Sequence, residues 1–196
     1  MTAAQSRVLT LNGGSSSIKF ALFETRDALR RVLEGRIERI GLPGAALAVK
    51  GVQPDETFSR PVAAADHAAA TGVLIGVLEK HIGGDILGAV GHRVVQGGPN
   101  YSEPQRITPG LVEELRRISA FDPQHLPAEI QLIEMFQRRF PDLAQVACFD
   151  TAFHRSMPRV AKLIPIPRRF DAIGIQRYGF HGLSYEFLME ELARLG

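Results

Sequence analysis

The stretch Asn-Gly-Gly-Ser-Ser-Ser-Ile-Lys at residues 12–19 combines glycines, hydroxyls and a cation between two apolar, strand-like segments. Glycines let a backbone turn tightly and approach a ligand, while serine hydroxyls and exposed N–H groups donate hydrogen bonds to phosphate oxygens. Lys19 adds a positive charge. The stretch therefore suits a phosphate site. Its spacing is not the Walker pattern, and a flexible hairpin loop has a similar composition, so both interpretations stay open.

A second candidate is Arg93, in Gly-His-Arg-Val-Val-Gln-Gly-Gly at residues 91–98. It lies near the end of an apolar segment that is typical of a buried strand. A guanidinium fixed there can bind a carboxylate or phosphate through two parallel hydrogen bonds. The alternative is a structural salt bridge, which is the more frequent role for an isolated arginine.

Asp150 and His181 complete the candidates for chemistry. Asp150 follows an apolar run in Phe-Asp-Thr-Ala-Phe-His, and His181 lies between an aromatic residue and a glycine in Tyr-Gly-Phe-His-Gly-Leu-Ser. Asp150 also suits a helix cap or turn, and His181 a tight turn around a core histidine. The histidines show no paired metal spacing, and one cysteine excludes a thiolate zinc set. Magnesium is the more plausible ion, because it binds mainly through water and substrate phosphates.

The sequence of the N-terminal part predicts an antiparallel meander. Residues 7–11, 18–24 and 31–40 have strand-like composition, and apolar side chains alternate at Ile18, Phe20 and Leu22. Glycines and prolines in residues 41–57 indicate loops or short strands.

Helices and buried strands then alternate. Residues 66–81 have helical apolar spacing with Asp66 as a cap, and residues 86–95 have the composition of a buried strand. Thr108 predicts the start of a helix with proline at its first position. A further helix begins near Pro127 and stops at Pro141.

The C-terminal part predicts a central strand at residues 143–149 and a last helix capped by Ser184. Prolines exclude residues 163–167 from a central strand, because proline lacks the ladder donor. This order predicts an α/β fold, a mixed sheet covered by helices.

Three polar candidates share one position in this fold. Asn12, Arg93 and Asp150 each stand where a predicted strand gives way to a loop. Ligands of such sheets gather at the carboxyl ends of strands, so the three side chains are expected to line one cleft.

Composition excludes several classes of partner. The 196 residues carry a formal charge of only +2, which argues against nucleic acid. The lone Cys148 has apolar neighbours and is expected to be a buried thiol in a reducing compartment, hence the cytoplasm. We expect no membrane association, because no apolar segment reaches the length of a bilayer span.

Taken together and in order, residues 12–19, 91–98, 149–154 and 177–184 resemble the acetate kinase (acetokinase) family. The resemblance implies the actin-like, sugar-kinase-like (ribonuclease H-like) ATPase fold. It implies ATP/ADP and Mg²⁺ as cofactors, with Asn12 near the magnesium. The residues implied near the ATP phosphates are Lys19, Ser15, Ser16 and Ser17.

The resemblance also implies roles on the second substrate. Arg93 would bind the acyl substrate, Asp150 and His181 would be catalytic as an active-site acid and a transition-state stabiliser, and Val95 and Phe180 would line the pocket for the acyl methyl. Gln96, Gln124 and Leu126 depart from the family pattern. Glutamine at position 124 would make that pocket more polar, which leaves the identity of the acid open.

Family members are longer than this chain. We expect residues 1–150 to form the N-terminal ATPase-type domain and residues 151–196 to begin a second, truncated domain. The implied reaction is ATP-dependent phosphorylation of acetate to acetyl phosphate, with a kinase for propionate or another short acid as an alternative. A non-catalytic nucleotide- or phosphate-binding fragment is the third possibility. The isolated chain is expected to be inactive and the full-length protein to be a homodimer.

Overall fold

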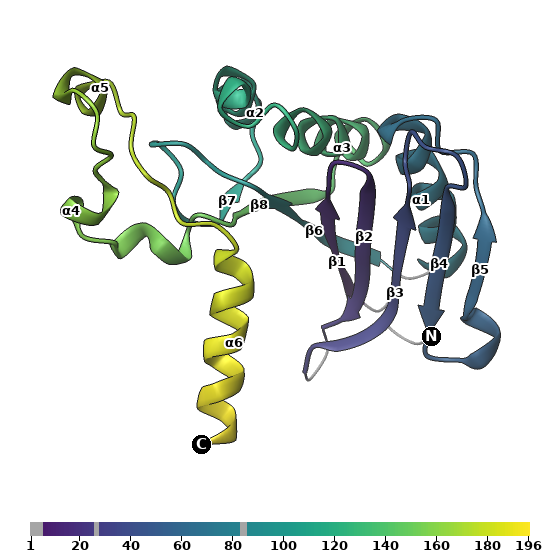
Figure 1. Cartoon of the computed structure of the whole chain (residues 1–196). Helices are drawn as coiled ribbons and strands as arrows, with labels where there is room; N and C mark the ends of the chain where they lie inside the picture. Colours follow the sequence, from purple (N-terminus) through teal and green to yellow (C-terminus); the bar gives the residue numbers. More distant parts are fainter. Residues whose placement is uncertain (1–5, 26–27, 83–85) are drawn as a thin grey trace.

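The computed structural model describes residues 6–25, 28–82 and 86–196. Its centre is an eight-stranded mixed sheet with the order β5-β4-β3-β2-β1-β6-β8-β7 (Figure 1). The strands are β1 (Ser6–Gly13), β2 (Ser17–Glu24), β3 (Arg30–Glu38), β4 (Ala46–Gly51), β5 (Phe58–Pro61), β6 (Ile86–Val94), β7 (Gln105–Arg106) and β8 (Ala144–Phe149). The helices are α1 (His67–Ile82), α2 (Pro109–Ile118), α3 (Leu126–Arg139), α4 (Arg159–Lys162), α5 (Arg168–Ala172) and α6 (Gly182–Leu195).

The sheet has an antiparallel half and a largely parallel half. Strands β1 to β5 pair antiparallel in sequence order. The pairing of β1, β2 and β3 confirms the predicted meander, and β4 and β5 extend it. Strand β6 then runs parallel to β1, and β8 runs parallel to β6. Parallel pairing requires crossovers, and α1 supplies the one before β6 while α2 and α3 supply the one before β8.

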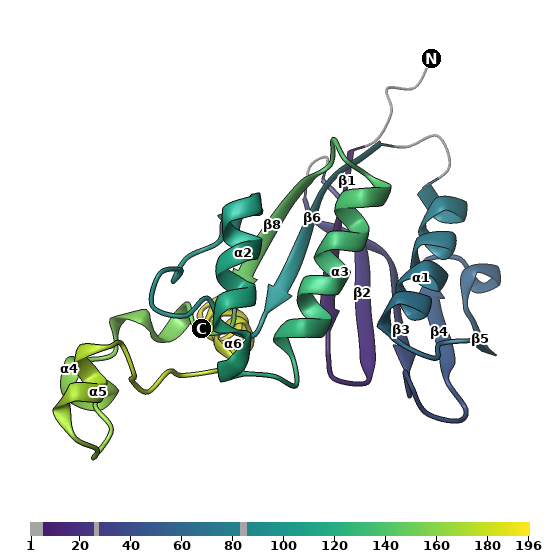
Figure 2. The same ribbon diagram turned by 90° about the horizontal axis from the view of Figure 1, so that it is seen from above.

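One face of the sheet is apolar and covered by helices. Ile18, Phe20 and Leu22 of β2 are buried, as their alternation predicts, together with Leu9 and Leu11 of β1. Helices α1, α2 and α3 lie on the same side of the strands (Figure 2). The opposite face of these strands carries the intervening polar side chains, because successive side chains of a strand point to opposite faces.

Two predicted helix caps are present. The Asp66 carboxylate accepts a hydrogen bond from the Ala69 N–H at 2.8 Å, and the Thr108 hydroxyl accepts one from the Leu111 N–H at 3.2 Å. Each side chain satisfies a backbone donor that the first helical turn leaves without a partner. Capping therefore fixes where α1 and α2 begin.

The prediction that Ser184 caps the last helix is wrong. Helix α6 begins at Gly182, and the Ser184 N–H already bonds to the His181 carbonyl at 3.0 Å, inside the first turn. The start is set by a tertiary contact instead, since the Gly182 N–H donates to the Asp150 carbonyl at 2.8 Å.

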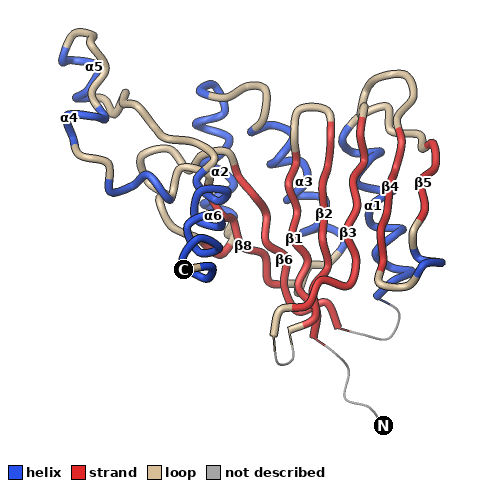
Figure 3. The backbone as a smooth tube through the Cα atoms, turned by 60° about the horizontal axis from the view of Figure 1, so that its bottom comes forward, coloured by secondary structure: helices blue, strands red, loops and turns tan. Residues whose placement is uncertain are grey.

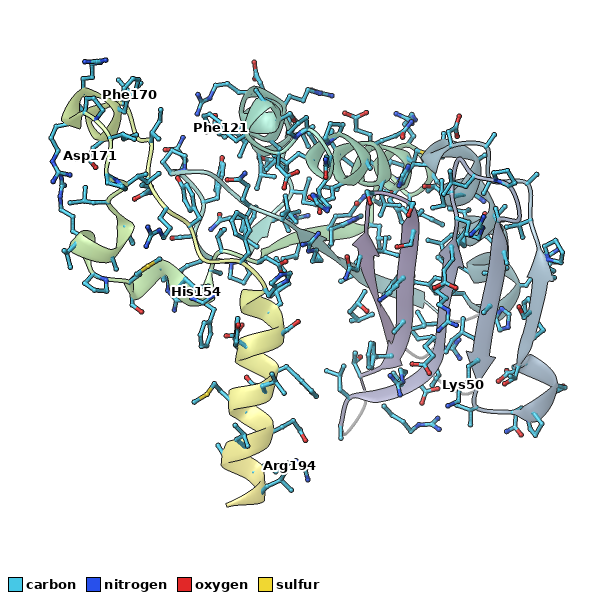
Figure 4. The ribbon with its side chains drawn as sticks, viewed as in Figure 1. Lys50, Phe121, His154, Phe170, Asp171 and Arg194 are labelled. Atoms are coloured by element: carbon cyan, nitrogen blue, oxygen red, sulfur yellow. The ribbon has the colours of Figure 1, made fainter. Side chains whose placement is uncertain are left out.

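Residues 150–196 extend beyond the sheet. Helices α4 and α5 form an arm outside its β8 side, and the tube trace shows no strand in this region (Figure 3). Residues 163–167 are not part of any strand, as their prolines predict. Helix α6 starts beside His154, whose ring packs edge-on against Tyr185 at 5.6 Å, and continues to Arg194 near its far end (Figure 4).

Helix α6 exposes many apolar side chains. The large exposed ones on this helix are Tyr185, Phe187, Leu188, Met189, Leu192 and Leu195. Within residues 6–25, 28–82 and 86–196, none of the helices has the length and hydropathy of a membrane span.

Candidate functional site

Four residues form a row across neighbouring strands. Lys19 of β2 pairs with Asn12 of β1, Asn12 lies beside Arg93 of β6, and Arg93 lies beside Cys148 of β8. Adjacent strands are about 4.8 Å apart, so the row places one cation on each side of the Asn12 amide. The row lies on the face that α1 and α3 leave uncovered, because the buried neighbours of each residue point to the helices.

A cavity of about 970 Å³ opens over this row. The volume is at the upper end of the range usual for small-molecule sites. Of the residues predicted from the sequence, it is lined by Asn12, Ser17, Lys19, Arg93, Asp150 and His181. The expectation that Asn12, Arg93 and Asp150 share one cleft is therefore confirmed. Ser15, Ser16, Val95 and Phe180 are not among its lining residues.

The serine-rich stretch forms the hairpin between β1 and β2. The Gly14 N–H donates to the Ser17 carbonyl at 2.7 Å, and the His67 ring donates through Nε2 to the Gly14 carbonyl at 2.8 Å. On the other side, the Ile40 N–H bonds to the Ser16 carbonyl at 3.0 Å. The turn is thus tied to α1 and to the end of β3, and it presents Gly14 and Ser17 to the cavity.

Arg93 is held by two carboxylates. Its Nε and one terminal nitrogen donate to Oδ2 of Asp150 at 3.0 and 2.6 Å, and its other terminal nitrogen donates to Oε1 of Glu129 at 2.7 Å. Asp150 is 5% exposed and its N–H continues the sheet ladder to the Val94 carbonyl at 3.0 Å. The structural salt bridge considered above is therefore present, and the same guanidinium lines the cavity.

Glu129 was missed by the sequence reasoning. It is 2% exposed on α3, and its Oε2 accepts a hydrogen bond from the Val95 N–H at 3.0 Å. The signal was available in the sequence, because Glu129 interrupts the apolar stripe of α3 between Leu126 and Ile133. Burial raises the pKa of Glu129 to about 7, against the lowering effects of the Val95 N–H and the Arg93 charge.

His181 has an unusual backbone. Its φ of 59° lies in the left-handed region, which costs a non-glycine residue roughly 1–2 kcal/mol. The next residue must be small: a Cβ on Gly182 would lie 2.3 Å from the Asp150 carbonyl oxygen and 2.8 Å from Cβ of Phe153. Gly182 thus lets α6 begin against Asp150, which brings His181 to the cavity.

The predicted acyl-pocket residues lie outside the cavity lining. Val95 is buried at 4% exposure, directly after β6, whereas Phe180 is 39% exposed and its carbonyl accepts a hydrogen bond from Nε2 of His154 at 3.1 Å. Gln124 is exposed on the loop before α3.

The expectation that Cys148 is a buried thiol is wrong, because its burial is only intermediate. Cys148 is half-buried and lines the cavity beside Arg93, because Ala147 and Phe149 take the helix-covered face of β8. Alternation, not the apolar composition of its neighbours, decides its exposure. Partial burial raises the pKa of its thiol.

His92 faces the helices instead of the row. It is 2% exposed, its Nε2 donates to Oε1 of Gln145 at 2.8 Å, and its ring packs edge-on against Phe136 at 5.9 Å. Burial lowers the pKa of His92 to about 4. The imidazole is therefore neutral at physiological pH.

The donors suited to a metal are few. Within the described ranges, no group of three or more histidine, cysteine or acidic side chains is arranged to hold an ion. The cavity offers the amide oxygen of Asn12 and the Asp150 carboxylate. Such a set fits magnesium, which keeps most of its waters and binds mainly to substrate phosphates.

Comparison with known proteins identifies the family. The profile described as "Acetokinase family" matches residues 7–195. The acetate kinase of Oceanobacillus iheyensis is 37% identical over 97% of this chain and 48% of its own length.

Two solved structures share the fold. The crystal structure of Porphyromonas gingivalis acetate kinase has a TM-score of 0.82 and 31% identity, and that of a Francisella tularensis propionate kinase has 0.85 and 33%. Each similarity covers 97% of this chain and 49% of the other. The chain spans about half the length of the relatives it matches. The profile match and the confirmed α/β fold show that the chain belongs to the acetokinase family.

Proposed function

We propose that this chain is the N-terminal portion of an acetate kinase, which transfers the γ-phosphoryl group of ATP to acetate and forms acetyl phosphate reversibly. The observation that carries this proposal is the row of Lys19, Asn12 and Arg93 beneath one cavity. In this row Lys19 and Arg93 lie on the two strands that flank β1. Two neighbouring cations suit a reaction in which two anionic reactants must meet. Residues 151–196 then begin the second domain.

The main obstacle to this reaction is electrostatic. Acetate is ionised at neutral pH, since carboxyl groups titrate near ~4, so no base is required to activate it. A carboxylate oxygen attacks the γ-phosphorus while the bond from phosphorus to the bridging oxygen breaks and ADP leaves. Both reactants are anions, so fixed cations and hydrogen-bond donors must offset their repulsion.

The lining residues predicted from the sequence each have a role in this proposal. Lys19 and the Gly14–Ser17 turn bind the ATP phosphates, and Arg93 binds the acid. Asn12 would help to hold Mg²⁺, which would supply neutralisation of charge on the phosphates. His181 stabilises the transition state from the start of α6. Asp150 orients Arg93, which its two hydrogen bonds to that guanidinium support.

Propionate is the second candidate for the acid. It is favoured by the similar match to the propionate kinase structure and to the acetate kinase structure. Both acids present the same carboxylate to Arg93, so the choice lies in the alkyl pocket, for which Val95 and Phe180 remain the predicted residues although neither lines the cavity.

The test is trapping of acyl phosphate with hydroxylamine. The chain is assayed with MgATP and acetate, propionate or butyrate, alone and mixed with the C-terminal half of the Oceanobacillus iheyensis acetate kinase. We expect acyl hydroxamate only in the mixture, with acetate preferred. Preference for propionate would assign the second candidate. If neither sample makes hydroxamate while the chain still binds MgATP, the chain is a nucleotide-binding fragment instead.

A further inference from the structure

Glu129 is an acidic residue in an apolar setting. It occupies the core-facing stripe of α3 with Ile130 and Ile133, and its side chain is 1% exposed. Burying a carboxylate is costly unless it is paired and hydrogen-bonded. A buried Glu129 carboxylate therefore requires hydrogen-bond donors for both of its oxygens.

The two oxygens of Glu129 have two different partners. Oε1 accepts from a terminal nitrogen of Arg93 at 2.7 Å, and Oε2 accepts from the backbone N–H of Val95 at 3.0 Å. One carboxylate thus links the side chain of Arg93, near the end of β6, to the backbone two residues later. The linked groups are those that the proposed function assigns to the carboxylate and the alkyl part of the acid.

Arg93 is fixed only when both carboxylates act. Asp150 holds Nε and one terminal nitrogen through a single oxygen, Oδ2. Rotation of the guanidinium about that oxygen is limited by a third hydrogen bond, which the remaining nitrogen donates to Glu129. The N–H groups that stay available then have one orientation beside the cavity, which is the preorganisation that anion binding needs.

We propose that Glu129 is a positioning residue for the acid substrate, whose carboxylate bridges Arg93 and the Val95 backbone so that the acid carboxylate and alkyl group are bound in one register. This inference rests on the proposed function. It assigns Glu129 no contact with the reacting atoms.

The bridge requires the ionised form of Glu129. Both partners are N–H donors, so a protonated carboxyl group can accept from only one of them with its remaining carbonyl oxygen. The groups that face Glu129 are Arg93 and the Asp150 that shares its guanidinium, His125 and Asp122 from the loop before α3, and the uncharged Gly13 of β1. With a pKa of about 7, Glu129 loses the bridge as the pH falls through neutrality.

The variant Glu129→Gln tests the bridge, because glutamine can accept only one of the two hydrogen bonds. Glu134→Gln is the matched control on the same helix, since Glu134 pairs with the exposed Arg116 at the surface. In the complemented kinase, we expect Glu129→Gln to lower kcat/KM for the acid about tenfold or more at pH 8, with KM for ATP unchanged. In the wild type, kcat/KM for the acid should decrease as the pH falls below about 7. This decrease should be absent from Glu129→Gln and present in Glu134→Gln. A Glu129→Gln profile identical to the wild type would overturn the proposal.

A spectroscopic readout separates this inference from the proposed function. In the ¹⁵N-labelled 196-residue chain, a fixed Arg93 should give a resolved Nε–H signal above pH 7 that broadens below it. The signal should be broad at every pH in Glu129→Gln. If the chain makes no acyl phosphate but this signal behaves as expected, only the function fails. If the wild-type signal is broad at every pH, the bridge is excluded, and this measurement serves even if Glu129→Gln does not fold.

Discussion

Asp150 binds Arg93 through one carboxylate oxygen, which accepts from Nε at 3.0 Å and from a terminal nitrogen at 2.6 Å. The two residues are 57 positions apart, and the parallel pairing of β6 with β8 brings them together. A carboxylate engaged in this way is suited to orient the guanidinium. It does not need to accept a proton, because the proposed acid substrate is already ionised.

Replacing Asp150 by asparagine tests this orienting role. Asparagine offers one neutral oxygen in place of the carboxylate, so Arg93 keeps a weaker hydrogen bond and loses the ion pair. We expect kcat to fall with little change in the shape of its pH profile. The measurement is hydroxamate formation against pH and magnesium concentration in the complemented enzyme. A shifted pH profile with an unchanged magnesium requirement would indicate proton transfer by Asp150 instead.

Arg93→Ala should remove about 3 kcal/mol of transition-state stabilisation, roughly a hundredfold in kcat/KM, if it resembles the loss of one preorganised donor. The same change leaves Glu129 and Asp150 without their cation, so the free energy of unfolding must be measured in parallel. Arg93→Lys is the control that retains charge but loses the planar fork. A loss of less than tenfold in a folded Arg93→Ala variant would exclude the proposed role.

Gly182→Ala should destabilise the chain and disturb His181. The added Cβ would lie 2.3 Å from the Asp150 carbonyl oxygen, and backbone shifts of this kind cost about 1–3 kcal/mol. Gly72→Ala on α1 is the matched control, because its Cβ meets nothing within 4 Å. Alanine should stabilise that helix by about 0.5–1 kcal/mol. Chemical denaturation of both variants gives the comparison, and equal effects would contradict the close packing at Gly182.

His92 should make stability depend on pH. The pKa of His92 in the folded state, about 4, lies below the usual 6.5. Its contribution to the free energy of unfolding is therefore complete above pH 6.5 and is lost as the pH falls towards 4. At about 1.4 kcal/mol per pH unit, the loss from pH 6.5 to pH 5 is about 2 kcal/mol.

The variant His92→Gln isolates this effect. Glu129 acts in the opposite direction over the same range, because its raised pKa favours the folded state at lower pH. The measurement is therefore the difference in the free energy of unfolding between wild type and His92→Gln, obtained by urea denaturation at pH 7 and at pH 5. A difference that stays constant between the two pH values would show that His92 is not buried in its neutral form.

The alternation of apolar side chains was sufficient to predict much of the sheet. Ile18, Phe20 and Leu22 were assigned to one face, which left Lys19 on the other, and the structure places it on the cavity side. Short-range chemistry also predicted the Thr108 cap. The two-residue strand β7 was not predicted, because its pairing with β8 depends on partners 40 and 42 positions away that no local pattern reveals.

The residues missed or misplaced have different physical causes. Glu129 was passed over although it breaks an apolar stripe, since its partners Arg93 and Val95 lie on another element. Ser184 was chosen as a cap because its residue type is right, but the contact of Gly182 with Asp150 starts the helix earlier. Cys148 was judged by its neighbours' composition, and strand alternation placed it on the cavity.

By itself the sequence determined the order of most strands and helices and the residue types able to bind anions, because periodicity, capping and turn formation act over a few residues. The tertiary structure alone decided that Arg93 is shared by Asp150 and Glu129, and that Lys19, Asn12 and Arg93 lie in one row. Those relationships depend on strand register and helix docking, which are set by the packing of the whole core.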